Sequence, residues 1–156
     1  MSLSMEKHRP VAALVLTLLS LIPAAALANC RVSTTPLNFG NYQPGGPTPL
    51  DVAGEVTADC RGHSVSYSLS LSPGASGDAA GRYMTLATER LYYNIYLDAA
   101  RMNIWGDGLG PTSLITGMMQ RNGRQIDRHQ FYGRVFSEQQ PSAGTYVDSL
   151  VVTILF

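Results

Sequence analysis

The sequence predicts an all-β fold, a sandwich of short strands. Along residues 30–156, apolar and polar residues alternate with a period of two, and Gly, Pro, Asn and Asp interrupt the pattern about every ten residues. A helix would repeat every 3.6 residues instead. The two cysteines of the chain add a predicted disulfide. We therefore expect one all-β domain over residues 29–156.

Residues 1–28 have the three parts of a cleavable secretory signal peptide. A basic start with Lys7 and Arg9 precedes an apolar run over residues 11–22, and small residues follow up to Ala28. We expect cleavage between Ala28 and Asn29. The protein would then work outside the cytoplasm.

Two alternatives to cleavage are an uncleaved membrane anchor and a lipid attached to Cys30. The apolar run is interrupted by Thr17 and Ser20 and is short for a span of about 20 apolar residues. Asn29 stands where a lipoprotein signal normally has a small residue. Both alternatives rank below cleavage.

Loss of residues 1–28 would leave a nearly neutral chain without lysine. The whole sequence has 11 basic and 11 acidic residues, and Lys7 is its only lysine. A neutral chain has no basic surface for nucleic acid and no polybasic patch for a membrane. We expect neither as a partner.

Cys30 and Cys60 both lie in the exported part, where an oxidising environment and an even count favour one intramolecular bridge. In the chain-entropy model, closing this loop stabilises the fold by about 3.5 kcal/mol. A redox site would need closely spaced cysteines, and two are too few for a structural zinc site. We expect a structural disulfide between the first strand and the end of the second.

The clearest strand covers residues 65–72, where apolar residues face one side and every residue between them is serine. A loop is expected over residues 73–78, and a further strand begins near Arg82 and continues through Leu86. Residues 91–97 are dense in aromatic and β-branched residues, which favours another strand.

In the second half of the chain, the sequence predicts an irregular segment over residues 98–111 and strands over residues 131–136 and 145–156. Asn122-Gly123 predicts a tight hairpin turn, because both residues tolerate positive φ. The last strand is apolar on both faces toward its end, which is typical of a strand buried in a sandwich or at an interface. Seven or so short strands indicate an immunoglobulin-like β-sandwich.

The sequence offers little catalytic chemistry. His63 and His129 have neither metal-ligand spacing nor a nucleophile motif beside them, and are interpreted as surface or strand-end residues. Gly106-Asp107-Gly108 lacks the regular oxygen ligands of a calcium loop and is interpreted as a turn. We predict no catalytic residue, metal site or cofactor; an exported enzyme is the third-ranked hypothesis.

Besides Cys30, five segments of the chain carry a family resemblance. They are Leu37-Asn38-Phe39-Gly40-Asn41-Tyr42, Val56-Thr57-Ala58-Asp59-Cys60, residues 91–98, Trp105-Gly106-Asp107-Gly108 and residues 144–156. The segments keep their order along the chain and together cover almost all of residues 30–156. They resemble the spore coat protein U family, which includes the subunits of archaic chaperone-usher pili of the Csu type.

The resemblance implies an incomplete immunoglobulin-like sandwich that lacks its last strand. A hydrophobic groove would then lie open between the first and final strands. In this family a periplasmic chaperone lends a strand to the groove, and the N-terminal extension of a neighbouring pilus subunit replaces it during assembly at the outer-membrane usher. Ordinary sandwich core is the alternative interpretation of the expected groove residues, which are Leu37, Phe39, Leu150, Val152, Ile154 and Phe156.

A donor strand of about ten residues would have to precede the first cysteine. After the predicted cleavage only Asn29 does so. The resemblance therefore implies an exported pilus subunit, in the periplasm and then at the cell surface, that accepts a strand but cannot give one. We expect it at a fibre terminus, as a tip or cap. The alternative is a free-standing secreted coat or adhesive β-sandwich module.

Overall fold

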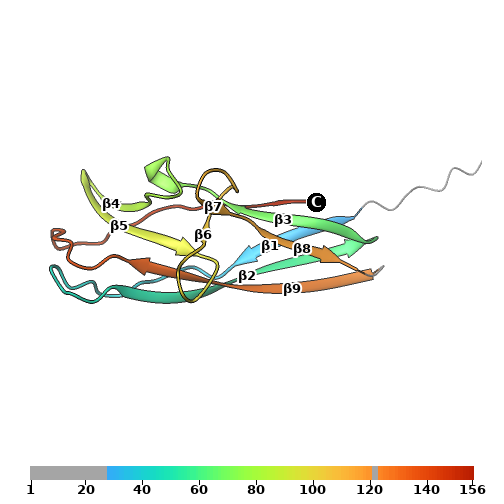
Figure 1. Ribbon diagram of the computed structural model, residues 1–156, viewed down its shortest axis with the longest axis horizontal. Coiled ribbons are helices and arrows are strands. Elements are labelled where there is room, and N and C mark those ends of the chain that lie inside the picture. The colour runs from blue at the N-terminus through green and yellow to red at the C-terminus, as the bar shows by residue number, and fades with distance from the viewer. Residues whose placement is uncertain (1–27, 121–122) are drawn as a thin grey trace, which may run out of the picture.

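The computed structural model describes residues 28–120 and 123–156, which form two stacked β-sheets (Figure 1). Sheet A has the strand order β1-β2-β9-β5-β6-β7, and sheet B has the order β10-β3-β8. The predicted all-β sandwich is confirmed. Residues 1–27, which hold most of the predicted signal peptide, lie outside the described residues.

The strands differ widely in length. Those of sheet A are β1 (Asn29–Thr34), β2 (Leu50–Gly62), β9 (Gly123–Val135), β5 (Glu89–Tyr96), β6 (Ile104–Trp105) and β7 (Thr112–Ser113), with β4 (Tyr83–Leu86) paired to the first half of β5. Those of sheet B are β10 (Val152–Leu155), β3 (Val65–Leu71) and β8 (Ile115–Met119). A single turn of 3-10 helix, η1 (Gly74–Ser76), follows β3.

The core lies between the sheets and follows the period-two pattern. On β3, Tyr67, Leu69 and Leu71 are buried, while the intervening serines face outward. Trp105 packs against Phe131 at a ring-centroid distance of 5.3 Å, and its indole N–H donates to the Leu69 carbonyl oxygen. Complete burial of a side chain such as Leu69 contributes about 1.5–3 kcal/mol to stability.

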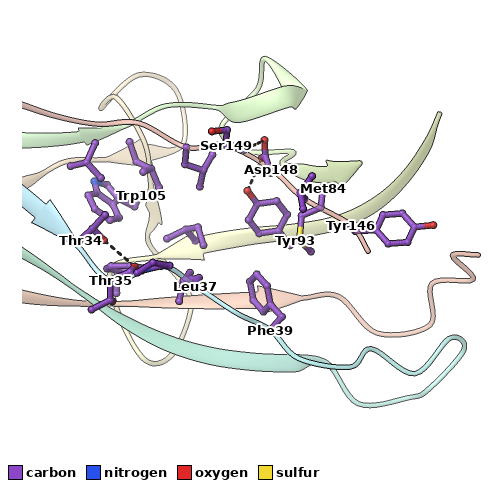
Figure 2. Close-up of a pocket in the computed structure, with 17 residues that line it drawn as sticks. Thr34, Thr35, Leu37, Phe39, Met84, Tyr93, Trp105, Tyr146, Asp148 and Ser149 are labelled. Carbon is purple, nitrogen blue, oxygen red and sulfur yellow. Dashed lines mark hydrogen bonds between the residues drawn. The ribbon is translucent and has the colours of Figure 1, made fainter. Parts of the chain in front are cut away.

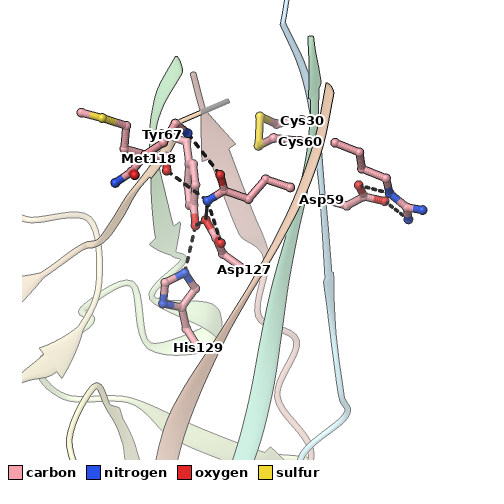
Figure 3. The surroundings of a disulfide bond; sticks show 10 residues. Cys30, Asp59, Cys60, Tyr67, Met118, Asp127 and His129 are labelled. Atoms are coloured by element: carbon pink, nitrogen blue, oxygen red, sulfur yellow. Dashed lines mark hydrogen bonds and ion pairs between the residues drawn. A yellow bond between two sulfur atoms is a disulfide. The ribbon is translucent and has the colours of Figure 1, made fainter. Parts of the chain in front are cut away.

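The disulfide joins Cys30 to Cys60, as predicted (Figure 3). The two cysteines are direct partners in the antiparallel register of β1 and β2, near the end of β2. Both side chains are buried between the sheets. The bridge therefore fixes the outermost strand of sheet A to its neighbour.

The hairpin prediction at Asn122-Gly123 is wrong. Asn122 lies outside the described residues, but the strands on either side of it belong to different sheets, because β8 pairs with β3 and β9 pairs with β2 and β5. The strand predicted over residues 131–136 extends back to Gly123, and all 13 residues of β2 pair with it.

The final strand is shorter than predicted. Only Val152–Leu155 form β10, and residues 145–151 are irregular apart from one bridge between Val147 and Thr85. This segment passes from β4 to β3, so it cannot keep one strand partner. Between these two strands, the segment is fixed to the chain after β3 by hydrogen bonds from the Ala75 N–H to Asp148 and from the Val151 N–H to the Ser72 hydroxyl.

His129 is not the surface or strand-end residue that the sequence suggested. It lies within β9 and faces sheet B, where its Nε2 is 3.0 Å from the Tyr67 hydroxyl oxygen (Figure 3). Tyr67 also donates to Asp127 at 2.8 Å. Burial, followed by this hydrogen bond, raises the pKa of Tyr67. His63, by contrast, is exposed just after β2, as predicted.

Arg82 is completely buried. It directly precedes β4, near the point on β5 where pairing with β4 ends and pairing with β9 begins. Its guanidinium donates to the carbonyl oxygens of Leu71, Ser72 and Ala79, and to the side-chain oxygen of Asn94. Burial lowers its pKa. Arg82 therefore ties the loop after β3 to the middle of β5.

Replacement of Arg82 by methionine should lower the free energy of unfolding by about 3 kcal/mol, because four acceptors, three of them backbone carbonyl oxygens, each lose a hydrogen-bond donor. Urea unfolding followed through the fluorescence of Trp105, the only tryptophan, measures this change. The matched control is Arg90→Met, since Arg90 is exposed and only stacks over the Tyr83 ring. Equal losses in the two variants would contradict the assigned role of Arg82.

Candidate functional site

The sandwich is open along the side where β1 and β10 pass each other. Within the described residues, β1 pairs only with β2 and β10 pairs only with β3, so each leaves one edge without a strand partner. The two strands approach each other without hydrogen-bonded pairing. Between the sheets at this opening lies a cavity of about 370 Å³ (Figure 2).

The cavity has a largely apolar lining drawn from both sheets. Hydrophobic side chains of sheet A and of the segment after β1 form one wall, and those of β3 and the C-terminal segment form the other. The apolar lining residues include Leu37, Phe39, Leu71, Ile95, Trp105, Phe131, Leu150 and Val152.

A second cavity, of about 490 Å³, continues the first toward the loops around Tyr42 and Ser142. Four residues line both cavities: Leu37, Phe39, Met84 and Tyr146. The two cavities therefore form one elongated depression, which we call the edge groove.

Two glycines allow Leu37 and Phe39 to lie against sheet A. Pro36 has no N–H to donate, and the pairing of β1 with β2 ends before it. The chain then crosses over Gly54 of β2 and Gly133 of β9. A Cβ at Gly133 would lie 2.8 Å from the Phe39 ring, and one at Gly54 would lie 3.1 Å from Leu37. Larger residues at these positions would push both side chains out of the groove.

The opposite wall is the segment from Tyr146 to Val152, whose alternate residues face the groove. Asp148 is the polar member of this series. It accepts a hydrogen bond of 2.7 Å from the Tyr93 hydroxyl of sheet A, and others from the Ala75 and Ser149 N–H groups. Gly74 has φ +69°, and a Cβ there would collide with the Asp148 carboxylate. Local backbone geometry thus depends on this glycine.

Glu89 holds the chain at the far end of the edge groove. Its carboxylate accepts hydrogen bonds from the Ser142 N–H and hydroxyl and from the Tyr146 hydroxyl. The Ser142 hydrogen bonds, and then that of Tyr146, lower the pKa of Glu89 below its usual value of 4.5. Residues 142–146 are therefore fixed to the start of β5 while Glu89 is ionised.

The structure brings together four of the six residues predicted for the groove, namely Leu37, Phe39, Leu150 and Val152. Ile154 packs against the core beyond the cavity, and Phe156 is 53% exposed. Their binding role stays a prediction. Sequence reasoning missed Tyr93, Trp105 and Phe131 as groove residues, because their alternation indicates burial without showing which side of the sandwich is open.

The described residues contain no group of three or more His, Cys, Asp and Glu side chains placed to hold a metal ion. Asp107 instead accepts hydrogen bonds from the Leu109 N–H and the Thr112 hydroxyl, as a turn residue does. Within the same residues, no helix has the length and apolar character needed to cross a membrane.

The family model of the Spore Coat Protein U domain matches residues 16–153. The chain belongs to this family. The family assignment made from the sequence segments is confirmed. The match spans both walls of the edge groove, and so this groove is a feature of a Spore Coat Protein U domain. No curated protein sequence matches the chain significantly.

A solved structure has a similar fold. It is the pre-assembly complex of the CsuC–CsuE chaperone and tip adhesion subunit from the archaic chaperone-usher Csu pili of Acinetobacter baumannii. The TM-score is 0.56 with 22% sequence identity, and the match covers 83% of this chain. This Spore Coat Protein U domain chain spans only 40% of the length of the matched chain.

Acidification should release residues 142–146 from Glu89. Because the folded pKa of Glu89 is lowered, its contribution is present above pH 4.5 and is lost as the pH falls through the lower, folded value. Glu89→Gln should produce the same release at neutral pH. The protection factor of the Ser142 amide, which is its exchange rate relative to an unstructured peptide at the same pH, measures this release and should fall in both cases.

Glu55→Gln is the control for this experiment, because Glu55 forms an exposed ion pair with Arg128 on the outer face of sheet A. It should leave exchange at Ser142 unchanged. Slow exchange at Ser142 in Glu89→Gln would show that the carboxylate does not hold the segment.

Proposed function

We propose that this protein is an exported structural subunit of a surface pilus assembled by a chaperone-usher pathway. A strand from a periplasmic chaperone fills the edge groove first, and a strand from a neighbouring subunit replaces it at the outer-membrane usher. The protein acts by assembly and not as an enzyme.

The observation that carries this proposal is an apolar groove between two strands whose facing edges have no strand partner. Unpaired edges beside exposed apolar surface promote aggregation unless another strand covers them. An added strand satisfies both needs, because its backbone pairs with the edges while alternate side chains enter the groove. At about 3.3 Å per residue, a strand of about ten residues spans such a groove.

The family and the fold support the same function. The chain belongs to the Spore Coat Protein U family, whose segments resemble archaic pilus subunits, and a complex of a pilus chaperone with a tip adhesion subunit has a similar fold. The neutral charge balance of the chain is consistent with partners recognised through backbone pairing and apolar contact rather than through charge.

We place the subunit at a terminus of the fibre, as a tip or cap. Cleavage between Ala28 and Asn29 would leave one residue ahead of Cys30, which is the residue where the disulfide anchors β1. Such a subunit receives a strand and has none to give. The terminal position depends on this cleavage, because a longer mature chain would keep residues ahead of Cys30 that could act as a donor strand. The family match begins at residue 16, ahead of the predicted cleavage site.

Val152→Asp should weaken strand binding. Val152 lines the groove, and a strand covering a carboxylate there would remove its water without supplying a partner, so affinity should fall by roughly a hundredfold. The matched control is Val151→Asp, since the neighbouring Val151 is 61% exposed on the other face. Co-export with the chaperone, followed by co-purification, measures the difference.

The wild-type chain exported alone should aggregate or be degraded, and should become soluble with the chaperone or a synthetic strand peptide. A soluble, cooperatively folding monomer that needs neither would contradict the proposal and support a free-standing coat or adhesive module. Equal chaperone binding by the Val151 and Val152 variants would place the interaction outside the groove.

The mass of the exported protein tests the terminal position. A mature chain that begins at Asn29 agrees with a tip or cap. A chain that keeps about ten or more residues before Cys30 would have a candidate donor strand and would contradict the terminal position, without affecting the role of the groove.

A further inference from the structure

A polar bridge joins the two walls of the edge groove between its ends. The Tyr93 hydroxyl on β5 donates to the Asp148 carboxylate on the C-terminal segment, at 2.7 Å. In Figure 2 this pair lies between Trp105 toward one end and Tyr146 toward the other. A strand that fills the groove must therefore pass a charged hydrogen-bonded pair between two apolar stretches.

Both members of the bridge are fixed in place. Tyr93 is 3% exposed, and burial together with the hydrogen bond to Asp148 raises its pKa, so the hydroxyl stays protonated and donates. Asp148 is held by the Ala75 and Ser149 N–H groups on its Oδ1 atom. The absent side chain at Gly74 leaves just enough space for the carboxylate.

The hydrogen bonds of Asp148 leave capacity for one more donor. An ionised carboxylate accepts about four hydrogen bonds, and within the described residues three donors reach Asp148. In the open groove, solvent can occupy the remaining site. Once a strand covers the groove, this site needs a donor from the strand, because a buried and incompletely paired carboxylate is costly.

The position of the bridge along the groove sets its place in a bound strand. Tyr146, Asp148, Leu150 and Val152 line the groove at every second position, and each is less exposed than the residues between them. A strand alongside this segment places its own inward side chains at the same interval. One inward residue then lies beside Asp148, and the residues two positions away face apolar side chains.

We propose that the strand accepted by the edge groove carries serine or threonine beside Asp148, with its hydroxyl donating to the Asp148 carboxylate, and bulky apolar residues at the neighbouring inward positions. This inference rests on the proposed function, because it specifies the partner of the same groove. A short hydroxyl side chain supplies the fourth hydrogen bond without displacing Tyr93. A leucine there would displace the bridge or cover the charge without a partner.

A peptide series tests this requirement. Each peptide alternates isoleucine, facing inward, with threonine, facing outward, and a single serine replaces each inward isoleucine in turn. One register should bind roughly tenfold more tightly than the all-isoleucine peptide, and the other registers should bind more weakly than it. Titration of the purified protein, followed through Trp105 fluorescence, gives the affinities.

Variants assign the preference to Asp148. Asp148→Asn removes the charge and should abolish the advantage of serine, whereas Tyr93→Phe keeps the carboxylate and should preserve it. Asp78→Asn is the matched control, because Asp78 accepts the Ala80 N–H in an exposed loop outside the groove, and the advantage should remain. If Asp148→Asn does not fold, loss of the advantage in Tyr93→Phe would still overturn the inference.

The possible failures are distinguishable. If no peptide binds, the proposed function of the groove fails. If the peptides bind but serine gives no advantage in any register, the groove function stands and the inference about Asp148 is wrong. An advantage of serine that persists in Asp148→Asn also overturns the inference.

Discussion

Hydrophobic burial is incomplete along one side of this sandwich, because β1 and β10 pass each other without pairing over an apolar floor. Glycines, hydrogen-bonded carboxylates and the disulfide around this opening fix the positions of its walls. Gly54 and Gly133 let Leu37 and Phe39 lie flat on sheet A, Asp148 and Glu89 fix the opposite wall at two points, and the disulfide fixes β1. A collapsed groove would bury more apolar surface, so these polar and covalent ties act against the collapse that the hydrophobic effect favours.

Two other surfaces of the domain, the outer face of sheet A and the β8 edge, carry polar side chains that disfavour the addition of a strand. The outer face of sheet A carries ion pairs: Arg134 of β9 and Arg101 of the loop after β5 contact Asp51, and Arg124 of β9 contacts Asp59. Hydrogen bonds from Arg134 and Arg124 lower the pKa values of Asp51 and Asp59. At the β8 edge, the Gln125 side chain pairs with the Met118 carbonyl oxygen and the Gln120 N–H. It occupies backbone groups that another strand would use. This difference between the apolar groove with unpaired edges and the two polar surfaces favours association at the groove.

The period-two pattern predicted β3 and β5 closely, because each keeps one face buried and one face polar or exposed for most of its length. It failed for residues 145–151, whose apolar alternation continues although the chain changes partner from β4 to β3. It also failed at Asn122-Gly123, because a turn motif does not reveal whether the following strand joins the same sheet. Arg82 was missed as a buried residue and the partly buried His129 as an inward-facing one, since their positions depend on partners brought together from distant loops and strands. The groove residues Leu37 and Val152 came from the family resemblance, whereas Tyr93 and Asp148 required the three-dimensional structure.

The location of the disulfide also affects how the domain would bear tension. In a fibre held together as proposed, force enters through strands lying lengthwise beside β1 and β10, so their backbone hydrogen bonds are loaded together in shear. The same load acts on the hydrogen bonds between β1 and β2, because β1 is the outermost strand of sheet A. Cys30 and Cys60 are the second pair in that register. A covalent bond there keeps β1 attached to β2 when their hydrogen bonds are under load, and the mechanical strength of the subunit would therefore depend on the oxidising conditions in which it folds.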